Sequence, residues 1–364
     1  MNKKTLLSIL SILLAFSMLL SACTKTEAEK PQEPVSPPVQ EPASSAEPES
    51  STRTITDHLG NTVEIPKDVD RVAATIGAYA HTTALLGEEE KLVATIKELS
   101  DTYKKVFPNV NPGGYDTSNA EEVIASGAQV IYGPNFKEEQ IAQYNAAGIS
   151  VVTINAFSNG EQMKDIVTLI AEILGDDAPE KAVAFNNRYD ENIKYVQEKT
   201  KDIPEADRVK ILNLRLSGGN YSTVNSSDIS SFYVDAAGGV VVSGDYTGEQ
   251  GSTSMTVGAE QIVAWAPDVI FTMTNEAKNQ MMSDPALTSV PAIKNGRVFV
   301  EPTGTYPWSV RSSEGALMPF FLAKIMYPEI FADLSVEDKT KEFYETFYGY
   351  KLNDEELAVI MAGQ

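Results

Sequence analysis

The stretch QMKDIVTLIAEILGDDAPEKAVAFNNRYDENIKYVQEKT, residues 162–200, decides how this 364-residue chain is organised. Its apolar residues recur at helical spacing over residues 163–174 and again over residues 184–196, with GDDAP between the two runs. The pattern predicts a long, nearly continuous helical region in the middle of the chain. Shorter segments of another kind flank it on both sides, so it divides the sequence into two parts.

In both parts, short strands alternate with helices. Before the helical region, a hairpin over residues 52–66 is followed by strands at 71–76, 129–132 and 149–154 and helices at 80–86, 120–125 and 137–147. After it come a strand at 209–216, a helix at 229–237 and a strand at 240–242. Such alternation predicts the α/β class, with mainly parallel sheets flanked by helices.

An internal repeat supports two similar lobes. The sequence AEEVIASGAQVIY at residues 120–132 matches AEQIVAWAPDVIF at residues 259–271, and each reads as a short helix feeding a buried strand. We therefore expect an N-terminal lobe at 52–160, a connecting region at 161–203 and a C-terminal lobe at 204–364.

The N-terminus has the three parts of an export signal: two early lysines, an apolar run and small residues before a cysteine. The sequence LSAC, ending at Cys23, resembles the lipobox of bacterial lipoproteins. This resemblance implies removal of residues 1–22, a lipid on Cys23 and a position on the outer face of the cell membrane. Residues 23–51 are rich in Pro, Glu and Ser, a composition typical of a disordered tether.

Composition excludes several classes of function. A formal net charge of -22 disfavours nucleic-acid binding, because phosphate would be repelled. Only two histidines are present, His58 and His81, so a His-rich metal centre is not expected. No G-x-S-x-G, H-E-x-x-H or phosphate-loop motif indicates an enzyme. One cysteine excludes an intrachain disulfide.

Taken in order, several segments resemble the substrate-binding proteins of ABC importers for iron–siderophore complexes, haem and vitamin B12. They are ITDHLGNTVEIP at 55–66, the two repeat units, PAIKNGRVF at 291–299 and LAKIMYPE at 322–329. The resemblance implies two α/β lobes joined by one long helix, with a ligand cleft between them. It also implies no cofactor, a monomer, and a permease that one acidic residue on each lobe contacts. The candidates are Glu138 or Glu139 on the first lobe and Glu276 on the second.

Ligands of open α/β sheets bind beyond the carboxyl ends of the strands, which selects four loops. We expect the ligand to contact residues from these loops and one further tyrosine: Tyr79, His81, Tyr115, Arg215, Tyr221, Tyr246, Tyr306, Trp308, Arg311 and Ser312. Arg311 offers a forked donor for an anion, and the aromatic residues offer flat apolar faces. The alternative is structural: Trp308 would pack in the core of the lobe, and Arg311 would form an ion pair with Glu314.

The resemblance implies that the cargo is a metal complex, either a ferric siderophore or haem. Cobalamin, a molybdate-like oxyanion and a nickel chelate are the alternatives. Haem would favour Tyr79 or His81, either of which has the chemistry to ligate iron, whereas an oxyanion would favour Arg311 and Ser312.

Overall fold

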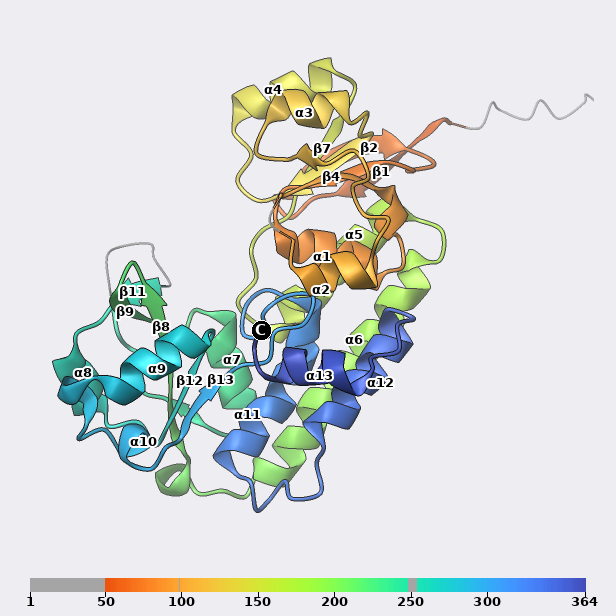
Figure 1. Ribbon diagram of the computed structural model, residues 1–364. Helices are drawn as coiled ribbons and strands as arrows, with labels where there is room; N and C mark the ends of the chain where they lie inside the picture. The colour runs from red at the N-terminus through yellow and green to blue at the C-terminus, as the bar shows by residue number, and fades with distance from the viewer. Residues whose placement is uncertain (1–49, 98, 248–253) are drawn as a thin grey trace, which may run out of the picture. The chain divides into compact units, whose positions relative to one another are not determined.

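The structure, a computed structural model, describes residues 50–97, 99–247 and 254–364. The predicted signal, Cys23 and almost all of the tether lie outside the described residues. The described chain is of the α/β class, as predicted, with one sheet on each side of the central helices (Figure 1).

The N-terminal lobe is built on a fully parallel five-stranded sheet in the order β5-β4-β3-β6-β7, with the predicted hairpin β1–β2 beside it. Its elements are β1 (Thr52–Thr56), β2 (Thr62–Pro66), β3 (Val72–Ala74), α1 (Gly77–Leu85), η1 (Glu89–Lys91), β4 (Leu92–Thr95), α2 (Asp101–Val106), β5 (Tyr115–Asp116), α3 (Ala120–Ala125), β6 (Val130–Gly133), α4 (Glu138–Ala146) and β7 (Ser150–Thr153). Val72 on β3, Val130 on β6 and Val152 on the edge strand β7 are fully buried. Burial on both faces is what a parallel sheet between helices requires.

The connecting region is two helices, α5 (Gly160–Leu174) and α6 (Ala178–Thr200), rather than one unbroken helix. Gly175 ends α5 with φ of 72°, Asp176 also has a positive φ, and Pro179 starts α6. A left-handed residue followed by proline stops one helix and begins the next. The helix α6 contacts α7 and α11 of the second lobe.

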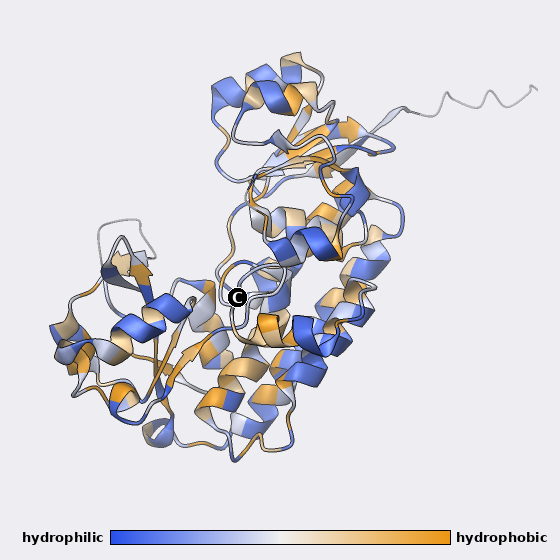
Figure 2. Ribbon diagram, in the orientation of Figure 1, coloured by the Kyte–Doolittle hydropathy of each residue, from blue (hydrophilic) through white to orange (hydrophobic). Residues whose placement is uncertain are grey.

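The C-terminal lobe contains a mixed sheet in the order β11-β9-β8-β12-β13, with β10 also paired to β8. Its elements are η2 (Glu205–Asp207), β8 (Lys210–Ser217), β9 (Asn220–Val224), α7 (Ile229–Ala236), β10 (Val240–Val241), β11 (Ser254–Thr256), α8 (Ala259–Trp265), β12 (Val269–Thr272), α9 (Asn275–Ser283), η3 (Pro285–Leu287), α10 (Pro291–Lys294), β13 (Val298–Val300), η4 (Ser313–Leu317), α11 (Met318–Met326), α12 (Val336–Phe347) and α13 (Asp354–Met361). The strands are mostly hydrophobic, whereas α9 and much of α6 are hydrophilic (Figure 2).

Residues 215–221, one of the four loops expected to meet the ligand, are part of a hairpin instead. Residues 215–217 and 220–224 are strands, joined by Gly218 and Gly219 with φ of 56° and 83°. A two-residue turn with both φ values positive matches the twist of paired strands, and glycine adopts it at little cost. Arg215 therefore lies within β8, in agreement with the strand predicted at 209–216.

Candidate functional site

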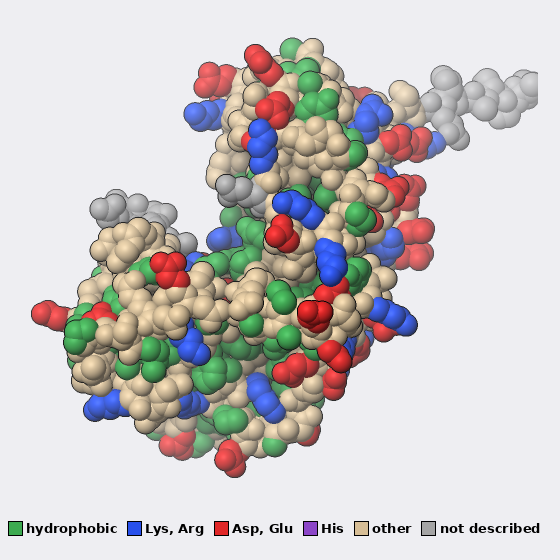
Figure 3. Space-filling view, in the orientation of Figure 1, with side chains coloured by type: hydrophobic (Ala, Val, Ile, Leu, Met, Phe, Trp, Pro, Cys, Tyr) green, Lys and Arg blue, Asp and Glu red, His purple; other side chains and the backbone are tan. Residues whose placement is uncertain are grey.

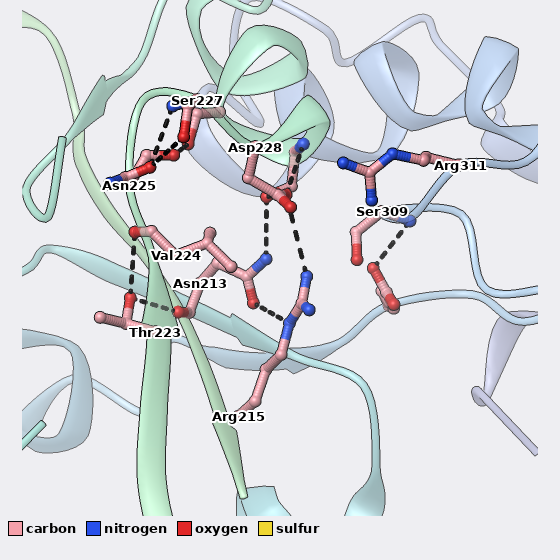
Figure 4. A network of polar contacts seen from close by, with 12 residues as sticks. Asn213, Arg215, Thr223, Val224, Asn225, Ser227, Asp228, Ser309 and Arg311 are labelled. Carbon is pink, nitrogen blue, oxygen red and sulfur yellow. Dashed lines mark hydrogen bonds and ion pairs between the residues drawn. The ribbon is translucent and has the colours of Figure 1, made fainter. Parts of the chain in front are cut away.

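Arg215 is the centre of a polar network at one end of β8. Its Nε donates to Oδ1 of Asn213 at 3.2 Å, and Asn213 donates in turn to Oγ of Ser230 at 3.0 Å. Oγ of Ser230 donates to Asp228, whose Oδ1 lies 4.0 Å from Nη2 of Arg215 (Figure 4). This ring of contacts fixes the guanidinium of Arg215. Its Nη2 atom is buried and has no hydrogen-bond partner in the described chain.

Asp228 belongs to the start of α7. Its Oδ1 accepts the backbone N–H of Ser230 at 3.0 Å, the usual arrangement of an N-cap aspartate. The preceding turn is held by Asn225, whose side chain accepts from the backbone and the hydroxyl of Ser227. The carboxylate beside Arg215 is thus positioned by local backbone geometry, with only a long, weak contact to the arginine itself.

Glu301 is a second carboxyl group near Arg215. It directly follows β13, it is fully buried, and its Oε2 accepts the backbone N–H of Ser309 at 3.1 Å. Burial raises the pKa of Glu301 to about 7, against the opposing effects of the Ser309 contacts and the Arg215 charge. Oε1 of Glu301 has no hydrogen-bond partner among the described residues.

Arg311 approaches the same network from the loop at residues 303–312. Its Nε donates to the carbonyl of Phe157, which precedes α5, at 2.7 Å. The rest of the guanidinium extends toward Asp228 and Ser309 (Figure 4). Two of the predicted ligand residues, Arg215 and Arg311, therefore face one polar region.

The loop that carries Arg311 is fixed by a buried acid, Glu314. Its carboxylate accepts five hydrogen bonds, from the backbone and hydroxyl of Thr305 at 2.9 and 2.6 Å, Trp308 Nε1 at 2.8 Å, Tyr344 at 2.9 Å and Tyr348 at 3.3 Å. Trp308 is fully buried and packs in the core, and Glu314 binds this tryptophan rather than Arg311. Trp308, which was expected to contact the ligand, is thus a structural support of the loop.

Ser312 and Tyr306 belong to the same loop. The hydroxyl of Ser312 accepts the backbone N–H of Glu314 at 3.1 Å and so starts η4. Tyr306 is half-buried, lies against His81 and is close enough to Arg311 for that charge to oppose the rise in its phenol pKa caused by burial. Tyr306 therefore offers a ring surface beside Arg311, whereas the hydroxyl of Ser312 caps η4.

Tyr79 and His81 lie inside α1. The hydroxyl of Tyr79 donates to the carbonyls of Ile154 and Asn155, and burial raises its pKa well above the usual range. His81 is 1% exposed, contacts the Thr305 hydroxyl through Nδ1 at 3.2 Å and lies edge-on to the Tyr103 ring. These positions are those of packing residues.

We predict that His81 destabilises the protein in acid. Burial lowers its pKa to about 3, so between pH 6.5 and 3 the unfolded chain binds a proton that the folded chain excludes. As the pH is lowered through this range, the unfolding free energy of the wild type should decrease, relative to that of His81→Phe, by about 1.4 kcal/mol per pH unit. Denaturant titrations of both proteins at several pH values measure the difference. A difference that does not change with pH would show that His81 titrates normally.

Three other predicted contacts lie apart from the arginines. Tyr115 is on the edge strand β5 and is held by Asn111. Tyr221 on β9 donates to Asp284 at 2.8 Å. Tyr246 packs against the Trp265 ring and donates to a backbone carbonyl. The structure therefore does not bring these tyrosines to the polar network.

The predicted docking acids occupy equivalent places in the two lobes. Glu138 and Glu139 form the first turn of α4, which follows β6, and Glu276 is in the first turn of α9, which follows β12. All three are exposed, and acidic side chains are visible over α3 and α4 in Figure 3. The strand–helix order of the repeat is thus preserved in space within each lobe.

A separate cavity of about 650 Å³ lies along α7 and β10, between Ser158 and Arg208. Arg215 and Arg311 do not line it. Within the described ranges, no three His, Cys, Asp or Glu side chains are grouped so as to hold a metal ion. No helix in the same ranges is both long and apolar enough to span a bilayer.

Sequence reasoning missed five members of the network: Asn213, Asp228, Ser230, Glu301 and Ser309. Asp228 had a signal, because an aspartate directly before a helix is a common N-cap. Glu301 immediately follows a strand, at the edge where ligands of α/β sheets bind. Nothing in the local sequence pairs either acid with Arg215, because that proximity depends on strand order.

Comparison with known proteins gives a consistent result. The family model described as "Periplasmic binding protein" matches residues 72–303. The molybdate-binding protein MolA of Haemophilus influenzae is 24% identical over 327 residues, covering 81% of this chain and 91% of that protein. Among solved structures, a periplasmic solute binding protein from Veillonella parvula is 25% identical with a TM-score of 0.73, covering 85% of this chain and 97% of that one.

The solved structure of MolA bound to molybdate has a TM-score of 0.70 at 21% identity, covering 83% of this chain and 99% of that one. The CeuE protein of Helicobacter pylori with Ni(II) bound has a TM-score of 0.66 at 16% identity, with 85% and 99% covered. At these identities the two likenesses concern the fold.

Proposed function

We propose that this chain, which belongs to the periplasmic binding protein family, captures a compact metal oxyanion of the molybdate class and delivers it to an ABC importer. Members of this family bind solutes outside the cytoplasm rather than transform them. The cargo is the part of the proposal that rests on this chain's own residues.

Two convergent arginines support an oxyanion. Nη2 of Arg215 is buried and has no hydrogen-bond partner in the described chain, only the 4.0 Å ion-pair contact with Asp228, while the terminal nitrogens of Arg311 extend toward the same region. Guanidinium forks match the geometry of tetrahedral oxyanions, and donors held in place before binding lose little entropy on contact. The hydroxyl of Ser309 adds a neutral donor beside them.

An anionic iron complex, the cargo expected from the sequence, is the second candidate. The half-buried ring of Tyr306 beside Arg311 favours it, because a flat ligand would stack there. Trp308 and His81 do not add to this surface, since both are buried in packing contacts. The oxyanion therefore uses more of the network than the larger ligand does.

Thermal unfolding with a panel of ligands tests the cargo. Molybdate or tungstate at 100 times its dissociation constant should stabilise the folded chain by about 2.7 kcal/mol, which raises the melting temperature by several degrees. Haem, ferric citrate, cobalamin and nickel–histidine should give no shift at equal concentration. Stabilisation by one of these four alone would replace the oxyanion with that cargo.

The proposal includes a membrane position and a partner. A lipid on Cys23 and the tether would hold the protein close to its permease, which raises the local concentration of cargo-loaded protein. The exposed first turns of α4 and α9 then present Glu138, Glu139 and Glu276 to basic residues of that permease. Such complementary charges set orientation and association rate.

Charge reversal tests this docking surface. Replacing Glu138, Glu139 and Glu276 together with lysine should reduce cargo uptake by cells at least about tenfold, because each pair becomes repulsive, while cargo binding by the purified protein is unchanged. Glu172→Lys with Glu180→Lys, on the exposed surfaces of α5 and α6, is the matched control. Normal uptake by the triple variant would rule out these acids as docking residues.

A further inference from the structure

Glu301 and Arg215 lie on the same face of the C-terminal sheet. The parallel register aligns Asn213 with Phe271 and Phe271 with Phe299. Arg215 and Glu301 each follow their aligned residue by two positions. Because side chains alternate between the two faces of a sheet, Arg215 and Glu301 project from the same face, with β12 between the two strands that carry them.

Several buried polar atoms in this region lack a hydrogen-bond partner among the described residues. Arg215 Nη2, Ser222 Oγ, Glu301 Oε1 and Ser309 Oγ are all buried without a hydrogen-bond partner among the described residues. Ser222 is the cross-strand neighbour of Arg215, and the backbone of Ser309 binds Glu301. Buried polar atoms are normally paired, so four together indicate a place that a polar ligand completes.

The charges of this region are balanced before any ligand arrives. The groups that face Glu301 are Arg215 from β8, Asp228 from the N-cap of α7 and the neutral Ser309 from the following loop. Gly363, which follows α13, lies close to the backbone of Glu301. With Arg311 included, two cations stand beside two carboxylates. A dianion added to this set leaves two uncompensated negative charges in a buried site, which is unfavourable.

We propose that Glu301 is a positioning residue that takes up one proton when the anion binds, so that Arg215 is released from it and serves the cargo. The proposal rests on the proposed function. The proton comes from water, converts the Glu301 carboxylate to a carboxylic acid and returns to water when the cargo leaves. No other bond forms or breaks.

The surroundings of Glu301 suit this exchange. Burial raises its pKa to about 7, so the carboxylic acid is easily formed near neutral pH. As an acid, it keeps Oε2 as acceptor for Ser309 and presents an O–H from the other oxygen. A donor at that place favours fully deprotonated anions over anions that still carry a proton. Folding stability should accordingly fall as pH rises from about 4.5 to 7, where only the folded chain keeps the proton.

Calorimetric titration of sodium molybdate in two buffers of different ionisation enthalpy, each with a pKa close to the working pH, measures the proton directly. At pH 8 the wild type should take up close to one proton per anion, and at pH 6 close to none. Its affinity should drop about tenfold per pH unit above pH 7. Glu301→Gln, which resembles the protonated acid, should bind molybdate with no proton uptake and no such pH dependence.

Glu329→Gln, an exposed change in the turn that follows α11, is the control and should behave as the wild type does. Molybdate binding without proton uptake by the wild type, or equal uptake by Glu301→Gln, overturns this inference alone. Absence of binding by molybdate and tungstate overturns the proposed function, and the inference with it. A folded Glu301→Gln protein is verified by its unfolding transition.

Discussion

Arg215→Ala should lower the affinity for molybdate by at least about 100-fold, equivalent to about 2.7 kcal/mol at 25 °C. Removal of the guanidinium takes away the buried donor Nη2 and leaves Asp228 and Glu301 without the cation between them. The site would then repel an anion. Calorimetric titration of the purified variant measures the change.

Arg215→Lys separates charge from shape. Lysine keeps the positive charge but lacks the fork that binds Asn213 while presenting a second nitrogen, so we expect a loss of about tenfold rather than recovery. Arg208→Ala, in the separate cavity along α7, is the matched control and should bind normally. Equal affinity of Arg215→Ala and the wild type would remove Arg215 from the site.

Glu314→Ala should lower the free energy of unfolding by about 3–5 kcal/mol, the largest stability effect we expect from one substitution, because several buried donors each lose their acceptor at a cost of about 1–3 kcal/mol. Five hydrogen bonds end on this carboxylate, and without it Trp308 Nε1 and the buried hydroxyl of Tyr344 lose an acceptor. Gly304 passes so close to the carboxylate that a side chain there would collide with it, so the loop is built around this acid. Urea titration followed by circular dichroism gives the value.

Glu314→Gln is the informative comparison. It keeps one oxygen for Thr305 but turns an amide N–H₂ toward other donors, so it should cost less than alanine and more than an exposed change such as Glu329→Ala. A loss below about 1 kcal/mol for Glu314→Ala would mean that the loop is held by other contacts. Arg311 would then be less fixed than its single bond to Phe157 suggests.

Much of the fold was predictable because it depends on local patterns. The repeat at 120–132 and 259–271 corresponds to α3–β6 and α8–β12, in the order expected. The hairpin at 52–66 has the predicted strands, and the N-terminal sheet is parallel. Helix spacing and strand alternation are encoded over a few residues, so each is visible before the chain folds.

The break between α5 and α6 and the β8–β9 hairpin were harder to predict. Gly175 and the Gly218–Gly219 pair each have a positive φ, but glycine also occurs in ordinary loops. The antiparallel pairing of β9 with β8 turns an expected ligand loop into a strand. Backbone conformation at a few glycines decided both features.

The candidate site was predicted only in part. Arg215 and Arg311 face the same network, as strand ends in α/β folds suggest, but whether they bind cargo stays a prediction. The buried Trp308 ring donates to Glu314, six residues away, and the position of Glu301 near Arg215 depends on sheet order. Contacts of this kind arise from tertiary packing, and no local pattern carries them.

Isothermal titration of the purified protein with sodium molybdate tests the central claim most directly. We predict one anion per chain with a dissociation constant below about 1 µM, corresponding to a binding free energy stronger than about −8.2 kcal/mol. No heat with molybdate or tungstate, together with saturable binding of haem or a ferric complex by the same preparation, would contradict the assignment of an oxyanion cargo.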